Sequence, residues 1–229
     1  MKKGILWFAS IMMLFALSAN AAEKAKPAAK KEAPKAEEPK AEEPKAEEGS
    51  GLKAGARMIL IKFDKGEMFG DGTDNGVVKS SLTKEKADKG KMYSCKIEAK
   101  KTGGEEGDGG KGLPGISKAS GILSGKRGNW DNYDTLNIKY ILEGEKPLTC
   151  QMLIGDASSY EKWRYGNYVE RSVVLQPGEN TLSLDITGLA CPGGARSLDL
   201  KNMRGFGFWA PNRPEDIVLY IQDVYVEKD

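Results

Sequence analysis

The residues best suited to chemistry are aromatic and lie together in one short segment. Residues 160–168, YEKWRYGNY, hold four large aromatic side chains among charged and amide ones. Aromatic rings pack on the apolar faces of a pyranose, while Arg and Asn side chains hydrogen-bond its hydroxyl groups. We therefore expect Trp163, Arg164, Tyr165 and Tyr168 to bind carbohydrate. The alternative is that two or three of these rings pack inward and pin a long loop.

Trp209 is a second candidate for the same chemistry. In GFGFWA, residues 205–210, strand alternation places Phe206 and Phe208 on one face and Trp209 on the opposite one. If the two phenylalanines belong to the core, Trp209 faces the outer surface of its sheet, where a ligand groove can form, or a loop covers it. Trp130 directly precedes a predicted strand, and we expect it to be a structural plug.

The composition excludes several classes of function. Histidine is absent, which removes the commonest general base, the usual nucleophile triads and every zinc site built on imidazole. The formal charge is only +2, from 35 basic and 33 acidic residues, so no excess of charge favours nucleic acid. We expect a protein that is not an enzyme.

The N-terminal part of the chain does not resemble a globular domain. Residues 1–21 have a basic start, an apolar stretch and an Ala19-Asn20-Ala21 cleavage signal, which predict a signal peptide. Residues 22–51 reduce to Ala, Lys, Glu and Pro with a repeated AEEPK unit, and seven Lys nearly balance eight Glu. Recurrent proline favours an extended disordered linker. We therefore expect an exported protein, periplasmic or extracellular, whose folded domain spans residues 52–229.

That domain shows a hydrophobic period of two, which is typical of strands that are buried on one face. Leu136, Ile138, Tyr140 and Leu142 share one face of such a strand. The expected strands are 58–63, 77–82, 92–99, 119–123, 134–142, 147–154, 168–175, 181–186, 204–210 and 217–227. Residues 143–146 are predicted to close a hairpin, and Pro177-Gly178 to form a type II turn. About ten short strands indicate an all-β antiparallel β-sandwich, with a jelly roll the favoured arrangement.

The three cysteines are an odd number for an exported chain, so at least one must lack a partner within the chain. Cys95 and Cys150 lie on predicted inward faces and could be ordinary core residues. Cys191 lies in a loop and is freer to reach a partner. Cys150 with Cys191 is the weakly preferred pair.

Taken in chain order, several segments resemble the jelly-roll carbohydrate-binding modules attached to bacterial glycoside hydrolases, within the galactose-binding-like group. The matching segments are mostly strand and turn signatures and span nearly all of residues 58–227: IKFD (61–64), DKGKMYS (88–94), NYDTL (132–136), LIGD (153–156), QPGENTL (176–182), LDL (198–200) with RGF (204–206), and LYIQDV (219–224). The resemblance implies polysaccharide binding without catalysis. It also implies a structural calcium linking the first and last strands, with Asp64, Glu67 and Asp223 as candidate ligands and no other cofactor.

Two functions from different classes follow. The first is a non-catalytic, exported glycan-binding domain on an extended tether, which binds polysaccharide or a cell-envelope glycan through surface aromatics. The second is a structural cell-envelope protein, such as a filament-sheath or surface-assembly subunit, that uses the same fold for contacts with envelope proteins. An uncharacterised enzyme is the third possibility. Beyond residues 1–21, no stretch of the sequence is apolar enough to predict a membrane span.

Overall fold

The computed structural model describes residues 51–70, 76–102, 113, 115–116, 121–194, 196–210 and 212–229. The predicted signal peptide and the predicted linker, except Gly51, lie outside these residues. Within them, no helix combines the length and the apolar character needed to cross a membrane.

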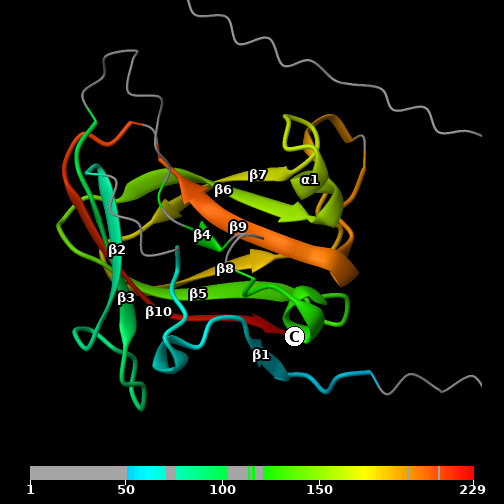
Figure 1. Cartoon of the computed structure of the whole chain (residues 1–229), viewed down its shortest axis with the longest axis horizontal. Helices are drawn as coiled ribbons and strands as arrows, with labels where there is room; N and C mark the ends of the chain where they lie inside the picture. Colours follow the sequence, from blue (N-terminus) through cyan, green and yellow to red (C-terminus); the bar gives the residue numbers. More distant parts are fainter. Residues whose placement is uncertain are drawn as a thin grey trace, which may run out of the picture. The chain divides into compact units, whose positions relative to one another are not determined.

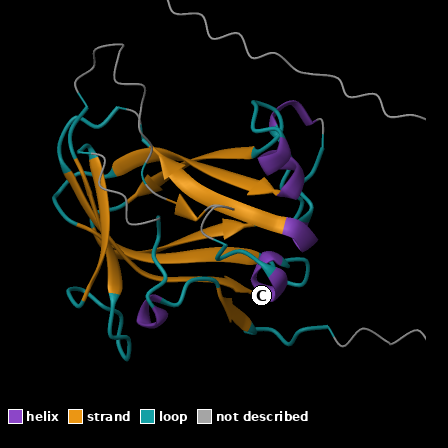
Figure 2. Cartoon of the chain, in the orientation of Figure 1, coloured by secondary structure: helices purple, strands orange, loops and turns teal. Residues whose placement is uncertain are grey.

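The described residues form ten strands in two antiparallel sheets, which confirms the predicted all-β sandwich (Figures 1 and 2). Sheet A has the order β2-β3-β10-β5-β8, and β1 pairs with the second half of β10. Sheet B has the order β4-β9-β6-β7. The strands of sheet A are β1 (Arg57–Ile59), β2 (Val78–Thr83), β3 (Ser94–Ala99), β5 (Thr135–Leu142), β8 (Gly178–Asp185) and β10 (Ile217–Glu227). Those of sheet B are β4 (Gly115–Ile116), β6 (Leu148–Asp156), β7 (Val169–Leu175) and β9 (Met203–Trp209).

Helices are few and short among the described residues. The α-helix α1 spans Ala157–Glu161 and directly follows β6. The 3-10 turns are η1 (Phe63–Lys65), η3 (Gly125–Gly128), η4 (Pro192–Gly194) and η5 (Leu200–Asn202).

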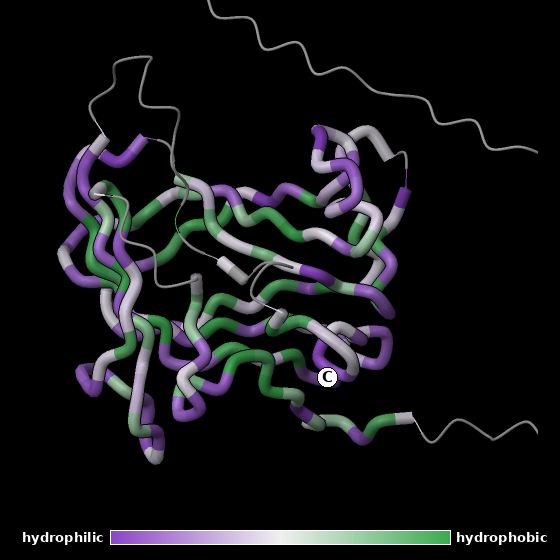
Figure 3. Tube along the Cα trace, viewed as in Figure 1, coloured by the Kyte–Doolittle hydropathy of each residue, from purple (hydrophilic) through white to green (hydrophobic). Residues whose placement is uncertain are grey.

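The core lies where the inward faces of the two sheets meet. Alternation on β5 buries Leu136, Ile138, Tyr140 and Leu142, as predicted. Figure 3 shows hydrophobic residues along the strands and hydrophilic residues in many of the connecting turns. Trp130 is fully buried, and its Nε1 donates a hydrogen bond to the Arg127 carbonyl at 2.8 Å, which confirms the expected plug.

Two predicted turns lead from one sheet to the other. Residues 143–146 lead from β5 in sheet A to β6 in sheet B, so the predicted hairpin is wrong. Gly178 has a φ of +82°, as the third position of a type II turn requires, but this turn also passes from sheet B to sheet A. Turn residues encode where the chain reverses, whereas sheet membership depends on distant partners.

Two predicted strands differ from those observed. The strand expected over 58–63 ends at Ile59, and the chain then turns through η1, which buries Phe63. Residues 121–123 of the strand expected over 119–123 are not in a strand, and residues 119–120 lie outside the described part. In this region the observed strand is β4, which pairs with β9 at Gly115–Ile116.

All three cysteines are free and buried, so the preferred Cys150–Cys191 disulfide is wrong. Cys191, expected to be accessible in its loop, is only 2% exposed. Burial raises the pKa of Cys95 to about 11 and that of Cys150 to about 12. Both thiols therefore remain protonated at neutral pH and act as small core residues.

Candidate functional site

The aromatic segment begins in α1, which a capping box holds at the end of β6. The Asp156 carboxylate accepts a hydrogen bond from the Ser159 backbone N–H at 2.9 Å, and the Ser159 hydroxyl accepts one from the Asp156 N–H at 3.1 Å. The helix ends at Glu161, and Trp163 lies in the loop that leads back to β7. The cap therefore sets the direction in which the aromatic loop leaves the sheet.

Trp163 lies directly on the outer face of sheet B. Met152 and Ile154 of β6 point into the core, so alternation turns Gly155 outward. A Cβ at Gly155 would lie 2.9 Å from the Trp163 ring and 3.1 Å from the Tyr160 ring. Glycine is therefore needed here because two aromatic rings pack against the backbone.

The rings of this segment also pack on each other. Trp163 and Tyr168 stack with ring centroids 4.6 Å apart and planes 9° apart, and Tyr160 meets Trp163 edge-on at 5.0 Å. Burial raises the pKa of Tyr160 to about 12. Trp163 nevertheless remains 47% exposed, and Tyr165 is 75% exposed. Trp163 therefore anchors the loop with one ring face and keeps other ring surface open to solvent, and its binding of carbohydrate stays a prediction.

An ion pair beneath the loop fixes it to the segment before η5. Arg196 donates to both oxygens of the Asp156 carboxylate, at 2.6 and 2.9 Å, and its Nε donates to the Asn167 side chain at 2.8 Å. The Asn167 amide in turn donates to the Ser158 and Lys162 carbonyls. Arg196 therefore ties both ends of the aromatic loop to one buried carboxylate.

The electrostatics of Asp156 reflect this arrangement. Burial alone would raise its pKa, but hydrogen bonds from Arg196, from the Asp199 backbone N–H and from Ser159 outweigh burial and lower the pKa to about 2. The carboxylate is therefore ionised throughout the neutral range and supports the loop as a permanent anion.

Trp209 lies on the same outer face, farther along the sheet. Phe206 and Phe208 are each 2% exposed and Trp209 is 38% exposed, which confirms the predicted alternation. Trp209 pairs with Gln151 of β6, and Gln151 pairs with Ser172 of β7. The structure thus brings Trp163 and Trp209 to one face, although they come from different elements.

We call this surface the B face. Trp163 and Tyr160 cover one end of it, over Gly155. Its other described members are the outward-facing positions of β6, β7 and β9: Thr149, Gln151, Leu153, Gly155, Glu170, Ser172, Val174, Gly205, Gly207 and Trp209. Arg164 and Tyr165 lie in the exposed loop at its end. The sequence analysis did not predict the polar side chains of β6 and β7 as part of the site. On β6 the signal was present, because Thr149 and Gln151 alternate with the buried Cys150, Met152 and Ile154.

The three carboxylates expected to bind calcium accept hydrogen bonds from groups of the protein. A Glu67 oxygen accepts hydrogen bonds from Arg127 at 2.6 Å and from the Lys62 N–H at 2.7 Å. An Asp64 oxygen accepts one from the Met92 N–H at 3.0 Å. Within the described part of the chain, no three acidic or cysteine side chains are grouped to hold a metal ion. The expected ligands are instead held by an arginine and by backbone N–H groups.

No protein-family model matches this chain, and no curated protein matches it significantly in sequence. Among solved structures, the chain is similar to the family 11 carbohydrate-binding module from Clostridium thermocellum in complex with a beta-1,3-1,4-mixed-linked tetrasaccharide, at 16% identity and a TM-score of 0.46, over 66% of this chain and 82% of that one. It is also similar to the Caldicellulosiruptor saccharolyticus family 27 module in complex with mannohexaose, at 12% identity and a TM-score of 0.45, over 76% of this chain and 98% of that one. A third similar structure is the family 22 xylan-binding domain from Paenibacillus barcinonensis, at 14% identity and a TM-score of 0.40, over 78% and 99% of the respective chains.

Proposed function

We propose that this domain binds polysaccharide without catalysis and holds it on the B face. The observation that supports this most directly is the location of its exposed aromatics. Trp163, Tyr165 and Trp209 are 47%, 75% and 38% exposed, and all three belong to sheet B or to the loop at its end. Apolar groups that gather on one surface among polar side chains are typical of ligand-binding sites.

The side chains between the rings suit a hydroxylated ligand. Gln151, Ser172 and Glu170 offer both donors and acceptors, and Leu153 adds an apolar contact. Gly207 has no side chain and is partly exposed, so a flat ligand can approach the backbone of β9 closely at this position. An aromatic surface with dispersed hydrogen-bonding groups matches the alternating apolar and hydroxyl surfaces of a sugar chain.

The spacing favours a chain over a single sugar. Trp163 packs at Gly155 and Trp209 pairs with Gln151, four residues away along β6, roughly 13 Å at the rise of a strand. One ring of a sugar cannot contact both indoles. The proposed ligand is therefore an oligosaccharide or polysaccharide that lies along β6 and β9.

We also propose that the protein is exported and that residues 22–51 act as a tether, on the basis of the signal-peptide pattern and the proline-rich composition. A glycan array probed with the purified protein, beside a size-exclusion run, tests the function. Saturable binding to oligosaccharides by a monomer supports the proposal. Self-assembly without sugar binding would favour the structural envelope protein instead.

A further inference from the structure

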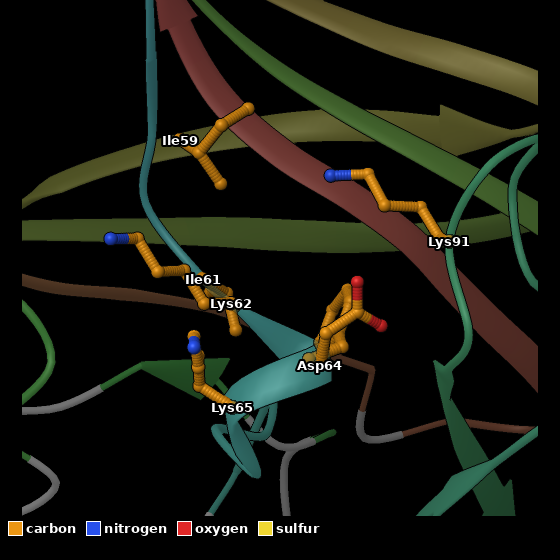
Figure 4. A pocket seen from close by; sticks show the side chains of 7 residues that line it. Ile59, Ile61, Lys62, Asp64, Lys65 and Lys91 are labelled. Carbon is orange, nitrogen blue, oxygen red and sulfur yellow. The ribbon is translucent and has the colours of Figure 1, made fainter.

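A separate pocket lies on the other sheet, where β1 meets η1. Its cavity measures about 240 Å³ and is lined by Ile59, Ile61, Lys62, Phe63, Asp64, Lys65 and Lys91 (Figure 4). Ile59 pairs with Tyr225 of β10, so the pocket opens beside sheet A and not on the B face. A ligand held here would be independent of the proposed function.

The pocket combines an apolar wall with cationic groups. Ile59 and Ile61 provide the wall, and Figure 4 shows Lys91 reaching toward Ile59 from the side opposite Lys62 and Lys65. Among the described residues, none of these three lysines makes an ion pair within the salt-bridge distance. Six other described lysines do form such a pair, as Lys139 does with Asp88 at 3.1 Å. The pocket therefore holds ammonium groups that are available to an anion.

Two carboxylates limit which anion fits. Asp64 lies on the rim, where one oxygen accepts from the Met92 N–H and the other accepts no hydrogen bond from the part of the chain that the structure describes. Lys91 also interacts electrostatically with the buried Asp223, so its charge is partly offset. Both carboxylates would repel a dianionic phosphate strongly. A monocarboxylate with hydroxyl groups is better matched, since its hydroxyls can donate to Asp64.

We propose that this pocket binds an acidic sugar, a uronic acid residue, with its carboxylate between the lysine ammonium groups and its apolar ring face on Ile59. Pockets for drug-sized ligands usually measure about 300–1,000 Å³. The cavity of about 240 Å³ is just below this range, which suits a single sugar ring, since that is smaller than a drug-sized ligand. The domain would then recognise an acidic saccharide on sheet A and a longer glycan on the B face.

A heteronuclear NMR titration of the purified, isotopically labelled protein tests the assignment, with glucuronate, glucose and acetate as separate probes at low ionic strength. We expect saturable shifts with glucuronate, centred on residues 59–65 and Lys91, and none with the other two probes. Added salt weakens binding because the contacts are between opposite charges. If acetate saturates the same amides as strongly as glucuronate, the pocket binds carboxylate alone and the proposal is wrong.

Charge-neutralising variants provide the matched control. Lys62→Gln and Lys91→Gln should each weaken glucuronate binding roughly tenfold, the scale of losing one charged hydrogen bond. Lys84→Gln removes the same charge from an exposed lysine outside the pocket and should leave the affinity unchanged. Equal affinity in all three variants, or glucuronate shifts that map to the B face, would overturn the assignment. Failure of the B face to bind polysaccharide would leave these outcomes unaffected.

Discussion

The indole of Trp163 and the phenol ring of Tyr168 stack face to face, with centroids 4.6 Å apart and planes 9° apart. This contact uses one face of the tryptophan within the protein, although the side chain remains 47% exposed. Trp163 thus links the stability of the loop to the surface that the loop presents.

Replacing Trp163 should therefore affect folding as well as binding. Trp163→Ala removes the stack on Tyr168 and the contact with Gly155, and we expect a loss of about 1–3 kcal/mol in the free energy of unfolding, less than for a fully buried tryptophan. Tyr165→Ala, at a position that is 75% exposed, is the control and should change stability by less than about 0.5 kcal/mol. Chemical denaturation measures both. Wild-type stability in Trp163→Ala would show that the stack contributes nothing to the fold.

The pair of Asp156 and Arg196 should be among the most sensitive positions in the domain. The Asp156 side chain is 1% exposed, so removing the guanidinium leaves a buried carboxylate without its partner. We expect Arg196→Ala to cost about 3–5 kcal/mol. Arg196→Lys keeps the charge but loses the two-pronged contact, and its cost should be intermediate. Equal stability of Arg196→Ala and wild type in a urea melt would contradict the stabilising role of the ion pair between Asp156 and Arg196.

Acid should weaken the same ion pair. The folded-state pKa of Asp156 is about 2, below the value of about 3.9 in an unfolded chain. The contribution to stability, about 2 kcal/mol, is therefore complete above roughly pH 4 and is lost as the pH falls through 2. Stability measured against pH for wild type and Asp156→Asn should show a difference that shrinks below pH 4. A difference that does not depend on pH would contradict this assignment.

Asp223 should show the opposite behaviour. Burial raises its pKa, and the nearby Lys91 only partly offsets this. When the folded-state pKa of a carboxyl group is raised, the protein loses stability as the pH rises and the group ionises. Ionised Asp223 therefore opposes folding at neutral pH. Asp223→Asn should therefore be more stable than wild type at neutral pH, with the advantage disappearing in acid. Asp216→Asn, which weakens the contact with Lys100 and leaves the charges around Asp223 unchanged, is the control and should not stabilise. If Asp223→Asn is less stable than wild type at neutral pH, ionised Asp223 stabilises the fold and the prediction is wrong.

The sequence predicted the strands better than their pairing. Alternation placed Leu136, Ile138 and Phe208 in the core because a half-buried strand leaves a local pattern. The turn at 143–146 left no local sign that it joins two sheets, since sheet membership depends on pairings such as β5 with β10. The segment η1 was also missed, because Ile61 and Phe63 continue the strand pattern while the chain turns.

The same distinction applies to the candidate site. The residue types at 160–168 singled out Trp163 and Tyr165, and the pattern of β9 placed Trp209 outward. Their presence on one face depends on the register of β6 with β9, and the support of the loop depends on Arg196, forty positions after Asp156. Contacts over such sequence separations arise from the tertiary fold and leave no periodic signal in a single sequence.

The most direct test of the B face is affinity electrophoresis of the purified protein in gels that contain soluble polysaccharides of different chemistry. We expect at least one polysaccharide to retard the wild type, and Trp209→Ala to lose roughly 1–3 kcal/mol of binding, the scale of aromatic stacking on a flat ligand. Leu52→Ala, at an exposed apolar residue outside both proposed sites, should migrate like the wild type. Equal retardation of wild type and Trp209→Ala, or no retardation by any polysaccharide, would contradict glycan binding on this surface.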